Sequence, residues 1–206
     1  ITGVRPLKKA YEYLVDQEGI DCVVLVDGGI DAVLCGNEFS IGTPSEDLTS
    51  VAAVSALSVP NKFMTCVGFG AEMRDGICHE QAFSRISQLL RDGAYLGATA
   101  LLPQTDAGRL YREAIQYIFK NQVAVKRSHI HKVVCQALEG QYGRHDEYIW
   151  LSPLMNMYWY FDLDIVAKTH KFLSELKDCE TAFDVVQWVR SLRINTEKQK
   201  RSVIPI

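Results

Sequence analysis

The run DCVVLVDGGIDAVLCGNEFSIGTPSED fills residues 21–47 and decides the expected fold. Its first part, residues 21–26, is a short β-branched segment in which polar and apolar residues do not alternate. That composition is typical of a parallel strand buried on both faces. An acid, two glycines, an isoleucine and a second acid follow at residues 27–31, so the strand is expected to end in an acidic, glycine-rich loop.

Outward from this run, helical patterns alternate with short apolar segments. The sequence TPSE at residues 43–46 predicts the start of a helix, with Thr43 as N-cap and Glu46 completing a capping box. Residues 154–168 are rich in aromatic side chains and fit either a strand or a helix. Further helices are predicted at residues 6–17, 79–91, 105–120, 128–138 and 181–193, and further strands at residues 62–67, 94–102 and 148–151.

This alternation predicts one α/β domain over residues 1–206. The expected architecture is a three-layer, Rossmann-like fold with a mostly parallel sheet and helices on both faces. No internal repeat, low-complexity tract or Pro/Ser-rich linker divides the chain. A second domain is therefore not expected.

Composition limits the partners that this chain is expected to bind. The formal net charge of its 206 residues is -3, which argues against nucleic acid and against an anionic membrane surface. The six cysteines show no zinc-type spacing, which favours a reduced, intracellular and cytoplasmic setting. Because the chain begins with Ile1 rather than methionine, an organelle signal upstream of it is the alternative.

Two glycine-rich loops follow predicted strands, at residues 27–31 and 68–72. Both are expected at the carboxyl edge of the sheet, where open parallel sheets bind ligands. Glycine lets the backbone approach a ligand closely, and acids hold divalent cations or accept hydrogen bonds from hydroxyl groups. Tight turns with capping acids are the alternative. The candidate ligand-binding residues of these loops are Gly28, Gly29, Asp31, Gly68, Gly70 and Glu72.

The segment between the first strand and the next helix adds three candidate ligand-binding residues, Glu38, Thr43 and Asp47. Asp27 and Glu38 are the candidate ligands of a divalent cation such as Mg²⁺. An acid near a helix N-terminus, as at Asp47, is also explained by the helix dipole alone. Because the acids here would repel a bare phosphate, the pattern favours a metal, an amine or plain capping.

His79 begins the predicted helix 79–91 and lies on its apolar stripe. Its loop is expected to leave the same sheet edge as Gly68, so His79 is expected to face Asp27. A histidine beside a carboxylate titrates near neutral pH and acts as an acid or a base. His79 and Asp27 are therefore the candidate catalytic residues, with a buried, hydrogen-bonded histidine as the alternative.

Other motifs are weaker. Gly68 and Gly70 lack the third glycine of a dinucleotide fingerprint, because Met73 stands there. His129 and His131 are two residues apart, so on a helix they point in different directions. A metal-binding pair on a helix would need a spacing of four residues. The aromatic run at residues 158–161 predicts a core or subunit interface, and a cover for a base or sugar is the alternative.

Five segments together resemble the family called domain of unknown function 1152. They are LVDGGIDAVLCGNE, GTPSED, GFGAEMRDGICHE, ALEGQYG and SPLMNMYWYFDLDIVA, and their order and spacing match over nearly the whole chain. The resemblance implies a shared α/β fold but no activity, because the family is uncharacterised. It also implies a glycine-rich strand and loop upstream of Ile1.

The chain departs from the pattern of this family at three positions. Ile30 stands where the resemblance implies threonine, and Asn37 and Glu72 stand where it implies aspartate. The first two exchanges remove polar groups from the expected site. They motivate an alternative in which catalysis is lost.

The sequence thus predicts an enzyme, or a protein descended from one, that binds a small polar ligand of nucleotide-like or phosphorylated chemistry. A divalent cation would assist at the carboxyl edge of the sheet. The alternative is a non-catalytic interaction subunit that retains the fold and assembles as a homo-oligomer.

Overall fold

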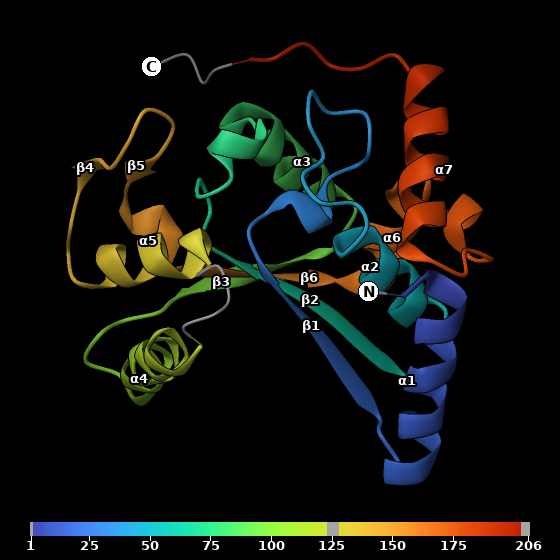
Figure 1. The fold of residues 1–206 in the computed structure, drawn as a ribbon, viewed down its shortest axis with the longest axis horizontal. Helices are drawn as coiled ribbons and strands as arrows, with labels where there is room; N and C mark the ends of the chain where they lie inside the picture. Colours follow the sequence, from blue (N-terminus) through green and yellow to red (C-terminus); the bar gives the residue numbers. More distant parts are fainter. Residues whose placement is uncertain (1, 123–127, 203–206) are drawn as a thin grey trace.

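The computed structural model describes residues 2–122 and 128–202. A sheet with the strand order β1-β2-β6-β3 lies at its centre (Figure 1). A small hairpin of two strands forms a separate sheet beside helix α5. The central strands are β1 (Cys22–Gly28), β2 (Asn61–Val67), β3 (Tyr95–Ala100) and β6 (Met157–Asp162), and the hairpin consists of β4 (Gly143–Arg144) and β5 (Trp150–Leu151).

The central sheet is mixed. Strands β1 and β2 pair in parallel, whereas β6 pairs antiparallel with both β2 and β3. The fold is therefore α/β, as predicted, but the sheet is not mostly parallel. Strand β6 follows a long connection through α4, α5 and the hairpin, and it returns between β2 and β3 in the opposite direction.

One face of this sheet carries most of the hydrophobic core. Met64 and Phe161 project from β2 and β6 into that core, where they meet apolar side chains such as Leu89 and Val166. The helices that contribute to it are α1 (Val4–Glu18), α2 (Asp47–Ser55), α3 (His79–Arg91), α6 (Leu163–Thr169) and α7 (Ala182–Ile194). None of the helices in the described ranges is both long and apolar enough to span a bilayer.

Among the described elements, those that cover the opposite face lie near its carboxyl end. There α4 (Asp106–Asn121) and α5 (His129–Leu138) lie beside the sheet, and Val67 packs against Val134 (Figure 1). Nearer the amino end of β1, Val24 and Val26 are 49% and 66% exposed. The continuous apolar run of β1 is therefore not buried on both faces within the described residues, although its composition predicted that.

Most predicted elements occur close to their expected bounds, and helix α3 begins and ends as predicted. Helix α2 differs, because it begins at Asp47 and Thr43 does not cap it with its side chain. Instead the carbonyl of Thr43 accepts hydrogen bonds from the N–H groups of Glu46 and Asp47 in the preceding turn. The predicted capping box is thus wrong, because the turn uses the backbone of Thr43 rather than its hydroxyl.

The aromatic run resolves into strand followed by helix. Trp159 and Phe161 of β6 are buried in the core, while Tyr160 lies on the other face and hydrogen-bonds Thr99. Asp162 then caps α6 by accepting a hydrogen bond from the N–H of Ile165. The run therefore serves mainly the core, which was one of the two outcomes expected.

The two faces of the sheet should respond differently to truncation. Phe161→Ala empties a fully buried site and is expected to lower the free energy of unfolding by about 3–5 kcal/mol. Val26→Ala removes exposed methyl groups and should cost less than about 1 kcal/mol. Urea denaturation of both variants tests this, and a loss for Val26→Ala as large as that for Phe161→Ala would show that this face is covered in solution.

Candidate functional site

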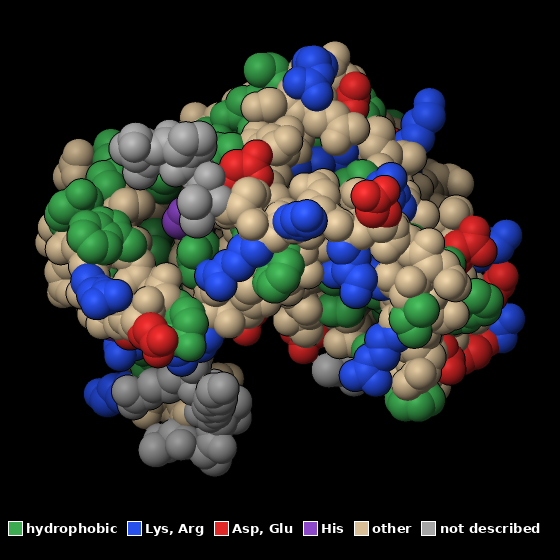
Figure 2. Space-filling model, turned by 90° about the horizontal axis from the view of Figure 1, so that it is seen from above, with side chains coloured by type: hydrophobic (Ala, Val, Ile, Leu, Met, Phe, Trp, Pro, Cys, Tyr) green, Lys and Arg blue, Asp and Glu red, His purple; other side chains and the backbone are tan. Residues whose placement is uncertain are grey.

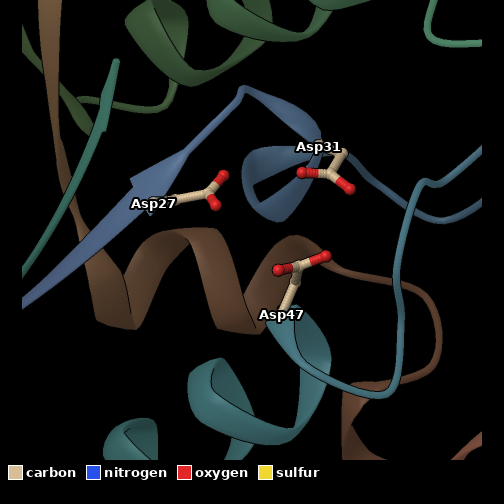
Figure 3. Close-up of side chains that lie close together, drawn as sticks. All are labelled: Asp27, Asp31 and Asp47. Atoms are coloured by element: carbon tan, nitrogen blue, oxygen red, sulfur yellow. The ribbon is translucent and has the colours of Figure 1, made fainter. Parts of the chain in front are cut away.

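Three carboxyl groups meet at the carboxyl end of β1 (Figure 3). Asp27 lies near the end of β1, Asp31 begins the 3-10 helix η1 (Asp31–Val33), and Asp47 begins α2. One oxygen of each lies within 4.8 Å of the other two. Three elements that are separate in the sequence thus direct their acids toward one point.

A fourth acid, Glu72, lies behind this group. Its carboxylate accepts hydrogen bonds from the N–H groups of Ile30, at 2.6 Å, and Asp31, at 3.2 Å. Only 6% of Glu72 is exposed. The loop after β2 therefore holds the loop after β1 in place through one buried side chain.

Two glycines leave room for these acids. A Cβ atom at Gly29 would lie 2.3 Å from the carboxyl group of Glu72, and one at Gly42 would lie 1.6 Å from Oδ2 of Asp31. Gly42 also has φ +58°, a left-handed conformation that side chains disfavour. The Oδ2 atom of Asp31 accepts a hydrogen bond of 3.1 Å from the N–H of Thr43. At these two positions glycine is required for the acids to be buried.

Within the described residues, the acids have no opposite charge to pair with. In the part of the chain that the structure describes, no lysine, arginine or histidine forms an ion pair with Asp27, Asp31, Asp47 or Glu72. The Oδ2 atoms of Asp27 and Asp47 are buried and have no hydrogen-bond partner there. Removing several carboxylates from water without a counter-charge is strongly unfavourable.

The pKa values record this cost. Burial, followed by the charge of Asp31, raises the pKa of Asp27 to about 7. Burial and the charges of Asp31 and Asp27 raise the pKa of Asp47 to about 10. Burial and Asp31 also raise the pKa of Glu72 well above its usual range. At neutral pH this acidic cluster, formed by Asp27, Asp31, Asp47 and Glu72, must therefore hold protons or a cation.

The donor atoms of the cluster suit a hard divalent ion. Carboxylate oxygens bind Mg²⁺ and Ca²⁺ at about 2.0–2.6 Å, so oxygens on opposite sides of one ion lie about 4–5 Å apart. The oxygens of Asp27, Asp31 and Asp47 are no more than 4.8 Å apart, which one ion can bridge. Cys66, which pairs with Asp27 across β1 and β2, is fully buried, and burial raises the pKa of its thiol well above its usual range. That thiol stays protonated and is a poor ligand.

Glu38 lies apart from the group of three aspartates. Its two carboxylate oxygens accept hydrogen bonds of 2.8 Å each from the N–H groups of Cys35 and Gly36. Glu38 is only 2% exposed, and Arg193 donates to its carbonyl oxygen. The structure therefore brings Asp27 together with Asp31 and Asp47, and it uses Glu38 to brace its own loop.

His79 is the first residue of α3, as predicted. Its ring lies 5.2 Å from that of Phe69, and burial lowers its pKa. Its Nε2 atom is buried without a hydrogen-bond partner in the described residues and would lie 2.7 Å from a Cβ atom at Gly70. The structure records no hydrogen bond or ion pair between His79 and Asp27 within those residues.

Helix α5 packs against the remaining glycines. Ile130 lies over Gly28 and Gly68, and the ring of His131 also lies against Gly28. The Nδ1 atom of His131 is 2.7 Å from the hydroxyl oxygen of Tyr111 on α4. The sequence spacing had set His131 aside as a metal ligand, and only the packing of α5 against β1 shows that it borders the glycine loop.

Comparison with known proteins agrees with the resemblance seen in the sequence. A model of the family described as "Protein of unknown function (DUF1152)" matches residues 1–201. No curated protein and no solved structure shows a significant match.

The acidic cluster predicts how stability depends on pH in the absence of divalent cations. A carboxyl group with a raised pKa in the folded state contributes stability below about pH 4, and that contribution is lost as the pH rises through about 7 for Asp27 and about 10 for Asp47. With EDTA present, the free energy of unfolding should fall between pH 5 and pH 9. Asp47→Asn should flatten this fall and be more stable than the wild type at pH 8 by at least about 1 kcal/mol. A wild type whose stability rises over this range would contradict the assignment.

Glu38→Gln tests the role of Glu38. An amide offers one acceptor where two N–H groups now donate, so the variant should lose about 1.5–3 kcal/mol of stability. Any thermal shift caused by divalent cations should be retained, because Glu38 lies outside the group of three aspartates. A folded Glu38→Gln protein that no longer responds to cations would instead make Glu38 a metal ligand, as the sequence predicted.

Proposed function

The chain belongs to this family, whose description assigns no activity, and we propose from the site itself that the protein binds a divalent cation and, through it, a small polar ligand. One observation carries the proposal. One buried and two half-buried aspartates converge from separate elements, without a counter-charge among the described residues, and the two half-buried ones each have a buried oxygen without a partner there. A divalent cation would satisfy both the charge and the unpaired oxygens.

A cation explains the site better than protons alone. Protonation would relieve the repulsion and would allow Asp27 and Asp47 to hydrogen-bond to Asp31, but it would not use the three oxygens that lie together, which a cation would bind at once. It would also leave unexplained why Gly29 and Gly42 make room for acids that apolar residues would replace at lower cost. The three aspartates place several oxygens close together, and a hard ion requires such a set of oxygens.

The ligand would complete the coordination shell of the ion. Three aspartate oxygens leave several positions of an octahedral ion for water or for ligand oxygens, as in sites that bind Mg²⁺ with phosphates. The acids would repel a free phosphate, so a phosphorylated or hydroxyl-rich ligand would enter together with the cation. This supports a nucleotide-like or phosphorylated ligand, with Asp27 as the central metal ligand.

His79 remains the proposed acid or base if the site is catalytic. Its lowered pKa keeps the imidazole neutral near pH 7, and its Nε2 atom has no partner among the described residues. A neutral imidazole can accept a proton from a hydroxyl group or a water molecule. Gly28, Gly68 and Gly70 would form the backbone wall beside it.

The test is a titration of metal-free protein with MgCl₂, MnCl₂ and CaCl₂, followed by thermal shift and calorimetry. A cation at a hundred times its dissociation constant should stabilise the fold by about 2.7 kcal/mol. Asp27→Asn and Asp47→Asn should weaken cation binding at least tenfold. The matched control is Glu46→Gln, which removes an acid beside Asp47 that is not part of the group of three.

Binding must also release protons, because the ion displaces them from Asp27 and Asp47. The apparent affinity should therefore rise between pH 6 and pH 8, and the heat of binding should vary with the ionisation enthalpy of the buffer. If no divalent cation shifts the folded wild-type protein at pH 8, the proposal fails. Equal weakening by Glu46→Gln would show a general charge effect and would also refute a specific site.

A non-catalytic, homo-oligomeric subunit is the second candidate, and the exposed apolar face of β1 favours it. Val24 and Val26 lie on an edge strand whose outer face no described helix covers. Exposed apolar sheet surface commonly marks an interface. Light scattering separates the candidates, because this one requires a stable oligomer that Val26→Lys dissociates and Asp27→Asn does not.

A further inference from the structure

A groove of about 600 Å³ lies between α7 and the loop of residues 39–44. Helix α7 lines the groove with one stripe of side chains. They are spaced three and four residues apart, and the stripe covers about two helical turns. Pocket volumes of this size accommodate small organic ligands. The residues of α7 that line it are Val186, Val189, Arg190, Arg193 and Ile194.

The groove combines apolar walls with positive charge. Phe39 and Ile41 form the wall opposite Val186 and Val189, whereas no aspartate or glutamate of the described chain lines the groove. Three cationic side chains do, namely Arg190, Arg193 and Lys198. Figure 2 looks down on the side of the molecule where α7 and this loop lie, and it shows Lys and Arg side chains among hydrophobic ones. The chain as a whole has a net charge of -3, so the lining of the groove is more positive than the chain as a whole.

The three cations differ in their availability. Arg193 donates hydrogen bonds to the carbonyl oxygens of Gly36, Glu38 and Phe39, so it fixes the wall of the groove. Arg190 and Lys198 are exposed and form no hydrogen bond or ion pair with any described residue. Two positive charges at the groove are therefore free to bind a ligand.

The loop wall also offers unpaired backbone groups. The N–H and C=O groups of Ser40, Ile41 and Gly42 have no hydrogen-bond partner in the described residues. The next N–H along the chain, that of Thr43, is held by Asp31 of the acidic cluster. The loop is thus anchored at one end by the cluster and at the other by Arg193, with free polar groups between them.

We propose that this groove binds a small organic anion, a phosphate, sulfate or carboxylate carried on a compact apolar body. Arg190 and Lys198 bind the anionic group, the N–H groups of Ile41 and Gly42 donate hydrogen bonds, and the walls bury the apolar body. The acidic cluster does not serve this ligand, since its acids lie on the other side of Gly42 and Thr43 and repel anions. The groove is a second site, and it stands whether or not the cluster holds a metal.

The experiment titrates the full chain with three matched probes by calorimetry and by amide NMR. 1-Naphthyl phosphate carries both features, 1-naphthol lacks the anion, and inorganic phosphate lacks the apolar body. Octanoate is a second amphipathic anion of different shape. We expect both amphipathic anions to bind, with at least tenfold lower affinity for naphthol and for phosphate, and with the largest shifts at the amides of Ile41 and Gly42. The affinity should fall with added NaCl, because the bound charges are partly exposed.

Variants assign the binding to the groove. Arg190→Gln combined with Lys198→Gln should weaken 1-naphthyl phosphate at least tenfold while leaving the melting temperature unchanged, because neither side chain contacts the fold through a hydrogen bond. The matched control is Arg91→Gln, an exposed arginine of α3 that does not line the groove. If neither amphipathic anion binds at 5 mM, the proposal is overturned. The proposal is also overturned if the double variant binds 1-naphthyl phosphate as tightly as the wild type, or if the NMR shifts are confined to other surfaces. It is overturned as well if 1-naphthol binds with the same affinity as 1-naphthyl phosphate.

Discussion

Four carboxyl groups, of which two are buried and two half-buried, lie together at the carboxyl end of the sheet, and the surrounding backbone is arranged to hold them. Burying an acid without a counter-charge is costly, and here the cost is offset only in part by hydrogen bonds from the N–H groups of Ile30, Asp31 and Thr43. The N-terminus of α2 adds a favourable dipole beside Asp47. Neutral side chains of similar size would make this end of the fold more stable. Acid clusters that lower the stability of the fold in this way are typical of functional sites.

The same constraint explains the shape of the neighbouring loops. Gly29 and Gly42 are glycines because acid side chains occupy the space that a Cβ atom would need. The hydrogen bond from Thr43 to Asp31 fixes one end of the loop 39–44, and Arg193 fixes the other. One strip of backbone therefore separates an acidic cluster from a basic, apolar groove. Opposite charges are kept apart within a few residues, so the proposed cation and the proposed anionic ligand would each bind on their own side.

The sequence predicted that acids and glycines gather in this region, but it did not predict which of the acids lie together. A strand that ends in an acid and two glycines predicted a site at the end of β1, and the helical period predicted α3 with its observed bounds. The sequence could not predict whether Asp27 lies beside Glu38 or beside Asp47, because that depends on how the segment between β1 and α2 folds back. The sequence also could not predict that β6 runs antiparallel to its neighbours, because local composition does not determine in which direction a strand enters the sheet after a long connection. The alternation of buried Trp159 and Phe161 with half-buried Tyr158 and Tyr160 on the opposite face was the available signal for a strand there.

The departures from the family pattern have a different meaning once the side chains are placed. Ile30 is buried in the core and serves Glu72 through its backbone N–H, which any residue but proline supplies. Asn37 lies in the loop that Glu38 braces, and its carbonyl oxygen accepts a hydrogen bond from the N–H of Gln199. Glu72 carries one methylene more than the aspartate that the resemblance implies, and that length lets it reach the loop after β1. None of the three exchanges removes a carboxylate from the group formed by Asp27, Asp31 and Asp47. The proposed cation site therefore does not involve the positions at which this chain departs from its family.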